Sequence, residues 1–310
     1  MTQAILLRLH RWIFVAFAIP LAVIIFTGLI LSFQPVLQTA GIKPGSLTLT
    51  QIEGYLDQHD KDGKARGLRI DHFEKSLSIQ GVGTDGSVDI DLRPGGEAAD
   101  DSWISEWISW ARPIHEHFVF DLEELTRVPI VLVSTIGMIF GMLVGVLMGL
   151  PRIRNTISGW HKATAWFLLP LLILSPLTGA FMALRITFGS AAAQRTQPVP
   201  VLEAVRMVAQ KHDISGLQSI RSRGGRQMAL VSEGNSRFTY LVSKDGLREA
   251  PSNWPRTFHQ GDFLGIWGGI MNVVLSLAFM LLLGTGLWIW GKRTFRRRRR
   301  VREPLTAAAG

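Results

Sequence analysis

Four long stretches of this chain contain no charged residue, and between them polar and apolar positions alternate over short intervals. Each uncharged stretch has at least 22 residues. At about 1.5 Å per helical residue, that length crosses a hydrocarbon layer about 30 Å thick. The pattern therefore predicts an α-helical membrane protein with four transmembrane helices, at Trp12–Phe33, Val128–Leu150, Ala163–Leu184 and Phe263–Trp290. The first stretch is longer than the apolar part of a signal peptide, so we expect an uncleaved anchor.

The two halves of the sequence resemble each other. LHRWIFVAFAIPLAVIIFTGLIL and WHKATAWFLLPLLILSPLTGAFM lie 151 residues apart, and each has an early histidine, a proline near the middle and a later Thr-Gly pair. After each comes a segment with apolar positions at helical spacing and then several short alternating runs, which predict a helix followed by strands. The sequence therefore predicts two parallel repeats, each made of a span, a small α+β domain and a second span.

These repeats divide the chain into eight parts. The boundaries are 1–36 for the N-terminus and first span, 37–127 for the first domain with a tryptophan-rich interfacial helix, 128–150 for the second span, 151–162 for a link, 163–184 for the third span, 185–262 for the second domain, 263–290 for the fourth span and 291–310 for a basic tail.

Positive charge gathers beside the ends of the predicted spans. KRTFRRRRRVR follows the fourth span, and PRIRNTISGWHK joins the second span to the third. Cationic residues mark the cytoplasmic side of membrane proteins, so we expect both termini and this link in the cytoplasm. The net charge of +9 is then explained by topology and by anionic lipid, and not by nucleic acid. The chain has no cysteine, which excludes disulfides, thiolate metal sites and covalent haem attachment.

A histidine lies near the start of each predicted span. His10 and His161 open the first span of each half, and His115 and His259 precede the second. The repeat places His10 opposite His161 near the cytoplasmic side and His115 opposite His259 near the other side. Imidazole is a standard axial ligand of haem iron, and helix-bundle interiors hold such sites. We therefore predict two b-type haems, each bound by two histidines.

The outer ligand of the first half is ambiguous, because HEH contains two histidines. Arg112 with His115 matches Arg256 with His259 as an Arg-x-x-His pattern. His117 lies about 200° around a helix from His115, so the two cannot face one site. The repeat favours His115 and leaves His117 as the alternative.

A zinc or copper site is the competing interpretation of the histidine pairs. Glu116, Asp121 and Asp262 are acids near the membrane that would complete such a site on one side only. For haem, the propionates need cationic partners, and these are expected among Arg8, Arg11 and Lys162 inside and Arg112 and Arg256 outside.

Glycines recur every four residues along the second span, at Gly137, Gly141, Gly145 and Gly149. Such a face of small residues predicts close packing against another helix. A flat surface left open for a porphyrin is the second interpretation of the same pattern.

The repeated LHRW-type opening of an apolar span, with TG near its end and small α/β domains between spans, resembles the PepSY-associated transmembrane proteins. That group includes iron-regulated inner-membrane proteins and ferric-siderophore reductases. The resemblance implies a bacterial inner-membrane location, haem b bound by membrane histidines and reduction of ferric chelates in the periplasm. We therefore expect a ferric-chelate reductase that carries electrons from an unidentified cytoplasmic donor to a periplasmic ferric siderophore.

Two other functions remain open. In the first, the chain is not an enzyme, and its PepSY-like domains bind a periplasmic partner while the spans only anchor them. In the second, the chain handles a metal ion without haem. The sequence shows no flavin or nicotinamide fingerprint, so a reductase of this kind needs an external electron donor.

Overall fold

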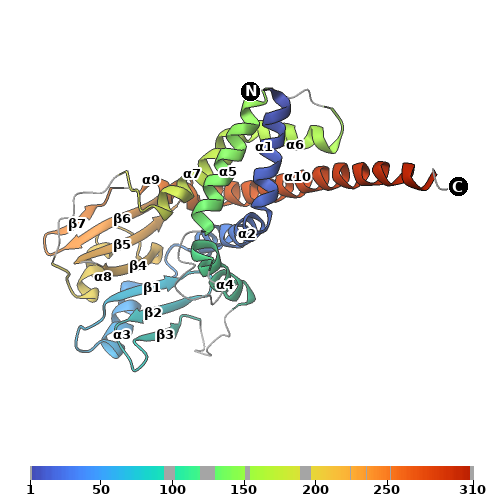
Figure 1. The fold of residues 1–310 in the computed structure, drawn as a ribbon. Coiled ribbons are helices and arrows are strands. Elements are labelled where there is room, and N and C mark those ends of the chain that lie inside the picture. The colour runs from blue at the N-terminus through green and yellow to red at the C-terminus, as the bar shows by residue number, and fades with distance from the viewer. Residues whose placement is uncertain are drawn as a thin grey trace. The chain divides into compact units, whose positions relative to one another are not determined.

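The chain forms two compact units in the computed structural model (Figure 1). The helical unit contains Met1–Leu31, Trp110–Ile186 and Asn272–Gly310, and the sheet unit contains Ser32–Ser109 and Thr187–Met271. The structure describes residues 2–93, 102–118, 130–150, 154–188, 197–223, 225–234, 236–251 and 253–307. Asp121, considered as a metal ligand, and Val128 and Pro129, the first residues of the predicted second span, lie outside these residues.

The apolar stretches of the sequence form the long helices. Among the described residues, three helices are long and apolar enough to cross a membrane, and the bent pair α6 and α7 would make a fourth span. The helices are α1 (Gln3–Ala16), α2 (Ala18–Gly41), α4 (Trp103–His117), α5 (Ile130–Leu147), α6 (Ile157–Phe167), α7 (Leu169–Ala183) and α10 (Ile266–Ala307).

The first and third predicted spans are not single helices, which corrects the prediction. The first is broken at Phe17, with φ −97° and ψ 11°, and the third at Leu168, with φ −97° and ψ 5°. Pro20 and Pro170 follow the two breaks. Proline has no amide hydrogen, and its ring clashes with the carbonyl four residues earlier, which ends the preceding helix. The spanning helix of the first half therefore begins at Ala18, and α6 and α7 meet at an angle of 67°.

Glycines of α5 bring it into close contact with α1. A Cβ atom built on Gly137 would lie 2.8 Å from Cε2 of Phe17, and one on Gly141 would lie 2.6 Å from Cε2 of Phe14. Distances this short mean that a larger residue would force the phenylalanine rings or the helices to move. The close packing expected from the glycine pattern is therefore present, although Gly149 lies beyond α5 with φ 83°.

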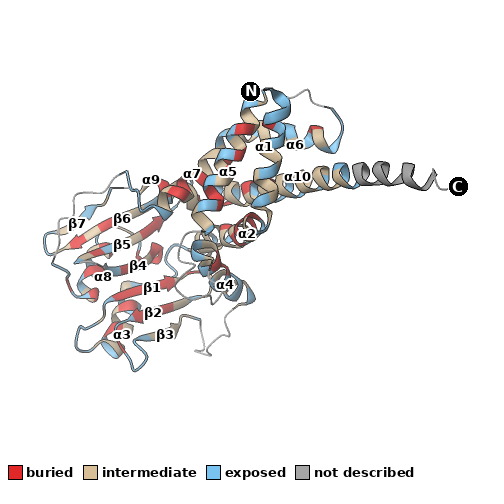
Figure 2. Ribbon diagram, viewed as in Figure 1, coloured by how far each residue is buried: buried red, intermediate tan, exposed pale blue. Residues whose placement is uncertain are grey.

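Large apolar side chains are exposed on these helices, and Figure 2 colours the exposed positions pale blue. Ile19 on α2, Phe140 on α5 and Trp288 on α10 are 78%, 51% and 61% exposed. Exposed apolar side chains on long uncharged helices are what a lipid environment requires. Buried contacts between the helices are made by a small cluster of Leu21, Ile25 and Met138, with Phe14, Phe17, Met142, Phe279 and Leu283 around it.

The sheet unit is built from both halves of the chain. Its seven strands run antiparallel in the order β3-β2-β1-β4-β5-β6-β7, and the halves join where Leu68 of β1 pairs with Ile220 of β4. The sequence predicted two separate small domains, and the structure instead has one continuous sheet. The strands are β1 (Gly67–Asp71), β2 (Ser76–Gln80), β3 (Ser87–Asp91), β4 (Leu217–Arg223), β5 (Arg226–Glu233), β6 (Ser236–Ser243) and β7 (Gly246–Glu249).

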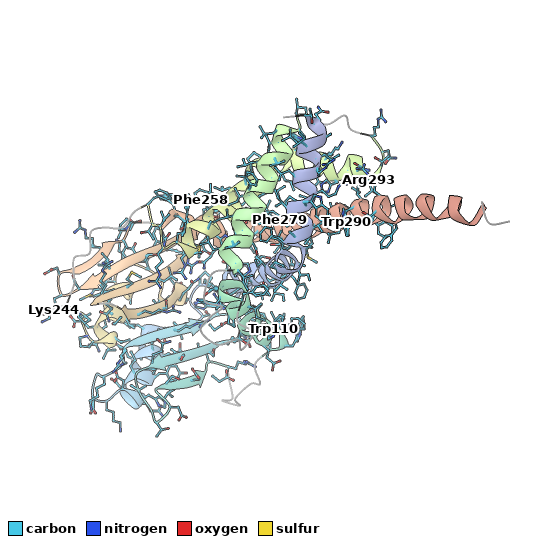
Figure 3. The ribbon with its side chains drawn as sticks, in the orientation of Figure 1. Trp110, Lys244, Phe258, Phe279, Trp290 and Arg293 are labelled. Atoms are coloured by element: carbon cyan, nitrogen blue, oxygen red, sulfur yellow. The ribbon has the colours of Figure 1, made fainter. Side chains whose placement is uncertain are left out.

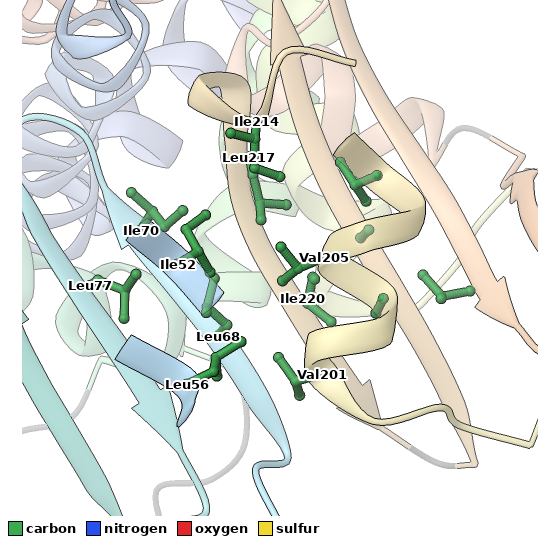
Figure 4. Packing of buried hydrophobic residues seen from close by; sticks show 14 of the residues in the cluster. Ile52, Leu56, Leu68, Ile70, Leu77, Val201, Val205, Ile214, Leu217 and Ile220 are labelled. Carbon is green, nitrogen blue, oxygen red and sulfur yellow. The ribbon is translucent and has the colours of Figure 1, made fainter. Parts of the chain in front are cut away.

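One hydrophobic core holds the two halves of the sheet unit together (Figure 4). Helices α3 (Leu49–His59) and α8 (Val201–Ala209) contribute Ile52 and Val205, which are fully buried with Leu68 and Ile220 of the joining strands. The alternation of buried and exposed positions along the strands explains why one face receives both helices.

A buried histidine adds a polar link between the halves. The Nε2 atom of His72 donates to the Leu217 carbonyl at 2.9 Å. Burial lowers the pKa of the His72 imidazole, so the ring stays neutral near pH 7. Its position after β1 is therefore explained by the seam between β1 and β4.

We expect Gly141→Ala to lower the thermal stability of the protein in detergent, because the new methyl group would overlap the Phe14 ring. Gly284→Ala in α10 is the matched control, since a Cβ there meets no atom within 4 Å. Melting followed by circular dichroism measures both variants. Equal melting temperatures for Gly141→Ala and the wild type would contradict the close contact of α1 with α5.

Candidate functional site

His10 lies in α1 and faces the glycine side of α5. Its Nδ1 atom donates a hydrogen bond to the Gly141 carbonyl at 2.8 Å, and its ring packs against Phe14 with 4.8 Å between the ring centroids. A carbonyl oxygen only accepts hydrogen bonds, so the hydrogen of the neutral ring is on Nδ1. The lone pair is then on Nε2.

His161 lies in α6 and bonds to α10 in a comparable way. Its Nδ1 atom is 2.8 Å from Oγ1 of Thr285. The Thr285 hydroxyl gives its own hydrogen to the Leu281 carbonyl at 2.6 Å, so it accepts from His161. The Nδ1 hydrogen is fixed again, and the lone pair is again on Nε2.

His10 on α1 and His161 on α6 both belong to the helical unit. The pairing of these two histidines, which the repeat predicts near the cytoplasmic side, stays a prediction. A metal-binding histidine usually donates its second ring hydrogen to a carbonyl or another acceptor, which fixes the tautomer and makes the ligand nitrogen more basic. The donor set of this pair fits an iron with two axial imidazoles.

His115 lies in the last turn of α4, where its Nδ1 atom meets α2. It is 3.0 Å from the Ile24 carbonyl and 3.2 Å from Oγ1 of Thr27. The Thr27 hydroxyl donates to the Val23 carbonyl at 2.7 Å, so Nδ1 of His115 is the donor to both oxygens. His117 is exposed at the end of the same helix.

His259 belongs to the other unit. It lies in the short helix α9 (Trp254–Gln260), beside Phe258, whose ring packs against those of Trp254 and Phe263 with centroid distances of 5.8 and 4.9 Å (Figure 3). Asn253 begins the helix by accepting the Arg256 amide hydrogen at 3.3 Å. The pairing of His259 with His115 remains a prediction.

The predicted cationic partners lie at or near the surface. Arg8 and Lys162 are exposed, and Arg11 is half-buried. Arg112 is 3.5 Å from the Glu116 carboxylate one helical turn away, and Nε of Arg256 donates to Gln260 at 3.3 Å. A surface ion pair such as that of Arg112 with Glu116 contributes little to stability.

The sequence did not identify the ion pair between Arg237 of β6 and Asp262, just after α9. Burial raises the pKa of the Asp262 carboxyl. Asp262 had been considered as a ligand for zinc or copper, and its observed partner is this arginine. Among the described residues, no group of three or more histidines, cysteines or acids is arranged to hold a metal ion.

The tryptophan helix has the expected surface. Trp103, Trp107 and Trp110 of α4 are 69%, 47% and 50% exposed, and Trp110 is labelled in Figure 3. Tryptophan favours the boundary between water and lipid, so this face of α4 is suited to lie at a membrane surface.

Comparison with known families gives a match over most of the chain. Curated proteins provide no significant match. The family described as the PepSY-associated TM region matches residues 7–293, a range that includes all four histidines placed at the mouths of the predicted spans. By this match, the chain belongs to the family of membrane proteins with the PepSY-associated transmembrane region.

Proposed function

We propose that this membrane protein binds haem b and carries electrons from a cytoplasmic donor to a periplasmic ferric chelate such as a ferric siderophore. The observation that carries the proposal is the pair His10 and His161. Both imidazoles have Nδ1 fixed by a hydrogen bond from the ring to a neighbouring helix, and both histidines belong to the helical unit.

The residues of the inner pair have distinct tasks. His10 and His161 would hold the iron through Nε2, while the Gly141 carbonyl and the Thr285 hydroxyl keep the rings oriented. Haem, when bound, supplies a carrier that accepts and gives one electron at a time. Arg8, Arg11 and Lys162 would be the cationic partners of the propionates.

The proposed outer pair is His115 with His259, as the repeat predicts. The contacts of His115 with Ile24 and Thr27 support it over His117, which is exposed. Arg112 and Arg256 are the corresponding propionate partners on that side.

The direction of transfer follows from the proposed orientation in the bacterial inner membrane, with both termini in the cytoplasm. Moving an electron outward from a negative cytoplasm gains about 2.3 kcal/mol per 100 mV. One electron reduces Fe(III) to Fe(II), which chelators of ferric iron bind more weakly. Reduction would therefore release iron from the chelate. The lipid bilayer, the donor and the chelate are the partners that this function needs.

The double substitution His10→Ala/His161→Ala should leave the protein with about half of its haem, because axial ligation is local to one pair of helices. In vesicles, a cytoplasmic donor should no longer support reduction of a ferric chelate on the other side. A membrane-impermeant reductant added on the periplasmic side should still reduce the remaining haem.

Haem content and difference spectra of the purified variant, together with ferrous-iron release from vesicles, make this measurement. Transfer from the cytoplasmic side at the wild-type rate would contradict the proposal. That outcome would favour a protein that binds a periplasmic partner and uses its spans as anchors.

His115→Ala should remove the outer haem, whereas His117→Ala should retain both haems. The reason is that His115 bonds to α2, while His117 is exposed. The two variants are matched controls for each other, since the substituted histidines lie two residues apart at the end of the same helix. Haem per protein measured after purification distinguishes them. Loss of haem in His117→Ala but not in His115→Ala would show that His117 is the ligand.

A further inference from the structure

Three imidazoles of the helical unit each lie against a glycine of a neighbouring helix. A Cβ atom built on Gly28 would be 3.0 Å from Cε1 of His115, and one on Gly145 would be 3.4 Å from Cε1 of His10. The third case is Gly286, where the distance to Cε1 of His161 would be 3.6 Å. Three histidines on three different helices therefore share one kind of neighbour.

The glycine has the same position relative to a backbone carbonyl in two of these cases. His115 bonds to the carbonyl of Ile24, four residues before Gly28. His10 bonds to the carbonyl of Gly141, four residues before Gly145. His161 bonds instead to Oγ1 of Thr285, the residue directly before Gly286.

Helix geometry explains this spacing. The carbonyl of residue i accepts the amide hydrogen of residue i+4 and has a second lone pair. A side chain on residue i+4 leans toward the helix N-terminus and covers the turn that contains this carbonyl. Glycine has no side chain, so the carbonyl stays open to a donor from another helix.

We infer that Gly28 and Gly145 are positioning residues, each of which opens the carbonyl four residues earlier to the Nδ1 hydrogen of a histidine, and that Thr285 is the positioning residue of His161. We call this arrangement of glycine and hydrogen-bond acceptor an imidazole seat. The seat fixes the ring so that Nε2 carries the lone pair. Only the identification of haem as the group that Nε2 binds rests on the proposed function.

Two seats contain a threonine directly before the glycine. Thr27 precedes Gly28, and Thr285 precedes Gly286. Each threonine hydroxyl donates to a carbonyl of its own helix, at 2.7 Å and 2.6 Å respectively, and each presents its oxygen to the imidazole Nδ1. The Thr-Gly pair thus supplies both an acceptor and the space for the ring.

The distances set an order of sensitivity for alanine substitutions. Gly28→Ala requires the His115 ring to shift by a few tenths of an ångström, so its site should bind haem about tenfold more weakly, as changes beside a metal ligand typically do. Gly145→Ala should have a smaller effect, and Gly286→Ala should retain normal binding at a distance of ordinary contact. Gly284→Ala, which meets no atom within 4 Å in the same helix as Gly286, is the control.

Two readouts measure this series in the purified full-length protein. The first is the amount of haem that stays bound per chain when the protein is diluted. The second is the binding of carbon monoxide to the reduced protein. Iron with two imidazole ligands has no open position for carbon monoxide, so binding should appear in Gly28→Ala and stay absent in Gly284→Ala. Size-exclusion chromatography checks that each variant is folded.

A second set of variants tests the threonine without changing a glycine. Thr285→Val removes the acceptor for His161, and Thr285→Ser keeps it. The reduction potential of the inner haem should rise in Thr285→Val, because an imidazole without this bond is a poorer electron donor to iron. It should remain at the wild-type value in Thr285→Ser and in Thr294→Val, whose hydroxyl donates to the Trp290 carbonyl in the same helix.

The outcomes separate the seat from the proposed function. If the wild type binds two haems but neither Gly28→Ala nor Thr285→Val changes binding, carbon monoxide access or potential, the seat is contradicted and the proposed function stands. If the wild type binds no haem, the proposed function is contradicted. The seat is then decided by ¹⁵N NMR of histidine-labelled protein, which should show His10, His115 and His161 with hydrogen on Nδ1, and hydrogen on Nε2 would contradict it.

Discussion

The hydrogen bond from a histidine Nδ1 atom to a neighbouring helix is the interaction on which the proposed site depends. An imidazole among apolar helices has no water to bond, and an unmade hydrogen bond there costs roughly 1–3 kcal/mol. His10 and His161 meet this requirement with a carbonyl and a threonine hydroxyl. The same bonds fix the tautomer, so the need to satisfy a buried donor also prepares a ligand nitrogen.

The close packing of the helices makes the histidine hydrogen bond possible. Gly137 and Gly141 let the rings of Phe17 and Phe14 lie directly on α5, which brings α1 close enough for His10 to reach the Gly141 carbonyl. In the sheet unit, the pairing of β1 with β4 and the bond from His72 to Leu217 join the two halves of the chain. Each unit is thus assembled from both halves.

Much of this arrangement follows from local sequence patterns. Uncharged stretches are long enough to reveal the membrane helices, and the glycine spacing of α5 correctly indicated close packing. The breaks at Phe17 and Leu168 were not predicted. Pro20 and Pro170 lie within the uncharged stretches, and whether each proline ends the preceding helix depends on the geometry of the turn before it. The single sheet was also missed, since pairing between Leu68 and Ile220 joins residues far apart in the chain. The acceptors of the histidines, such as Thr285, could not be assigned because they lie on other helices.

The most direct test of the central claim is the visible spectrum of the purified wild-type protein, before and after reduction, with haem quantified per chain. Nε2 ligation by paired histidines predicts a low-spin b-type spectrum and about two haems per chain, with no carbon monoxide binding in the reduced state. A protein that remains colourless when its host is supplied with haem would contradict the account.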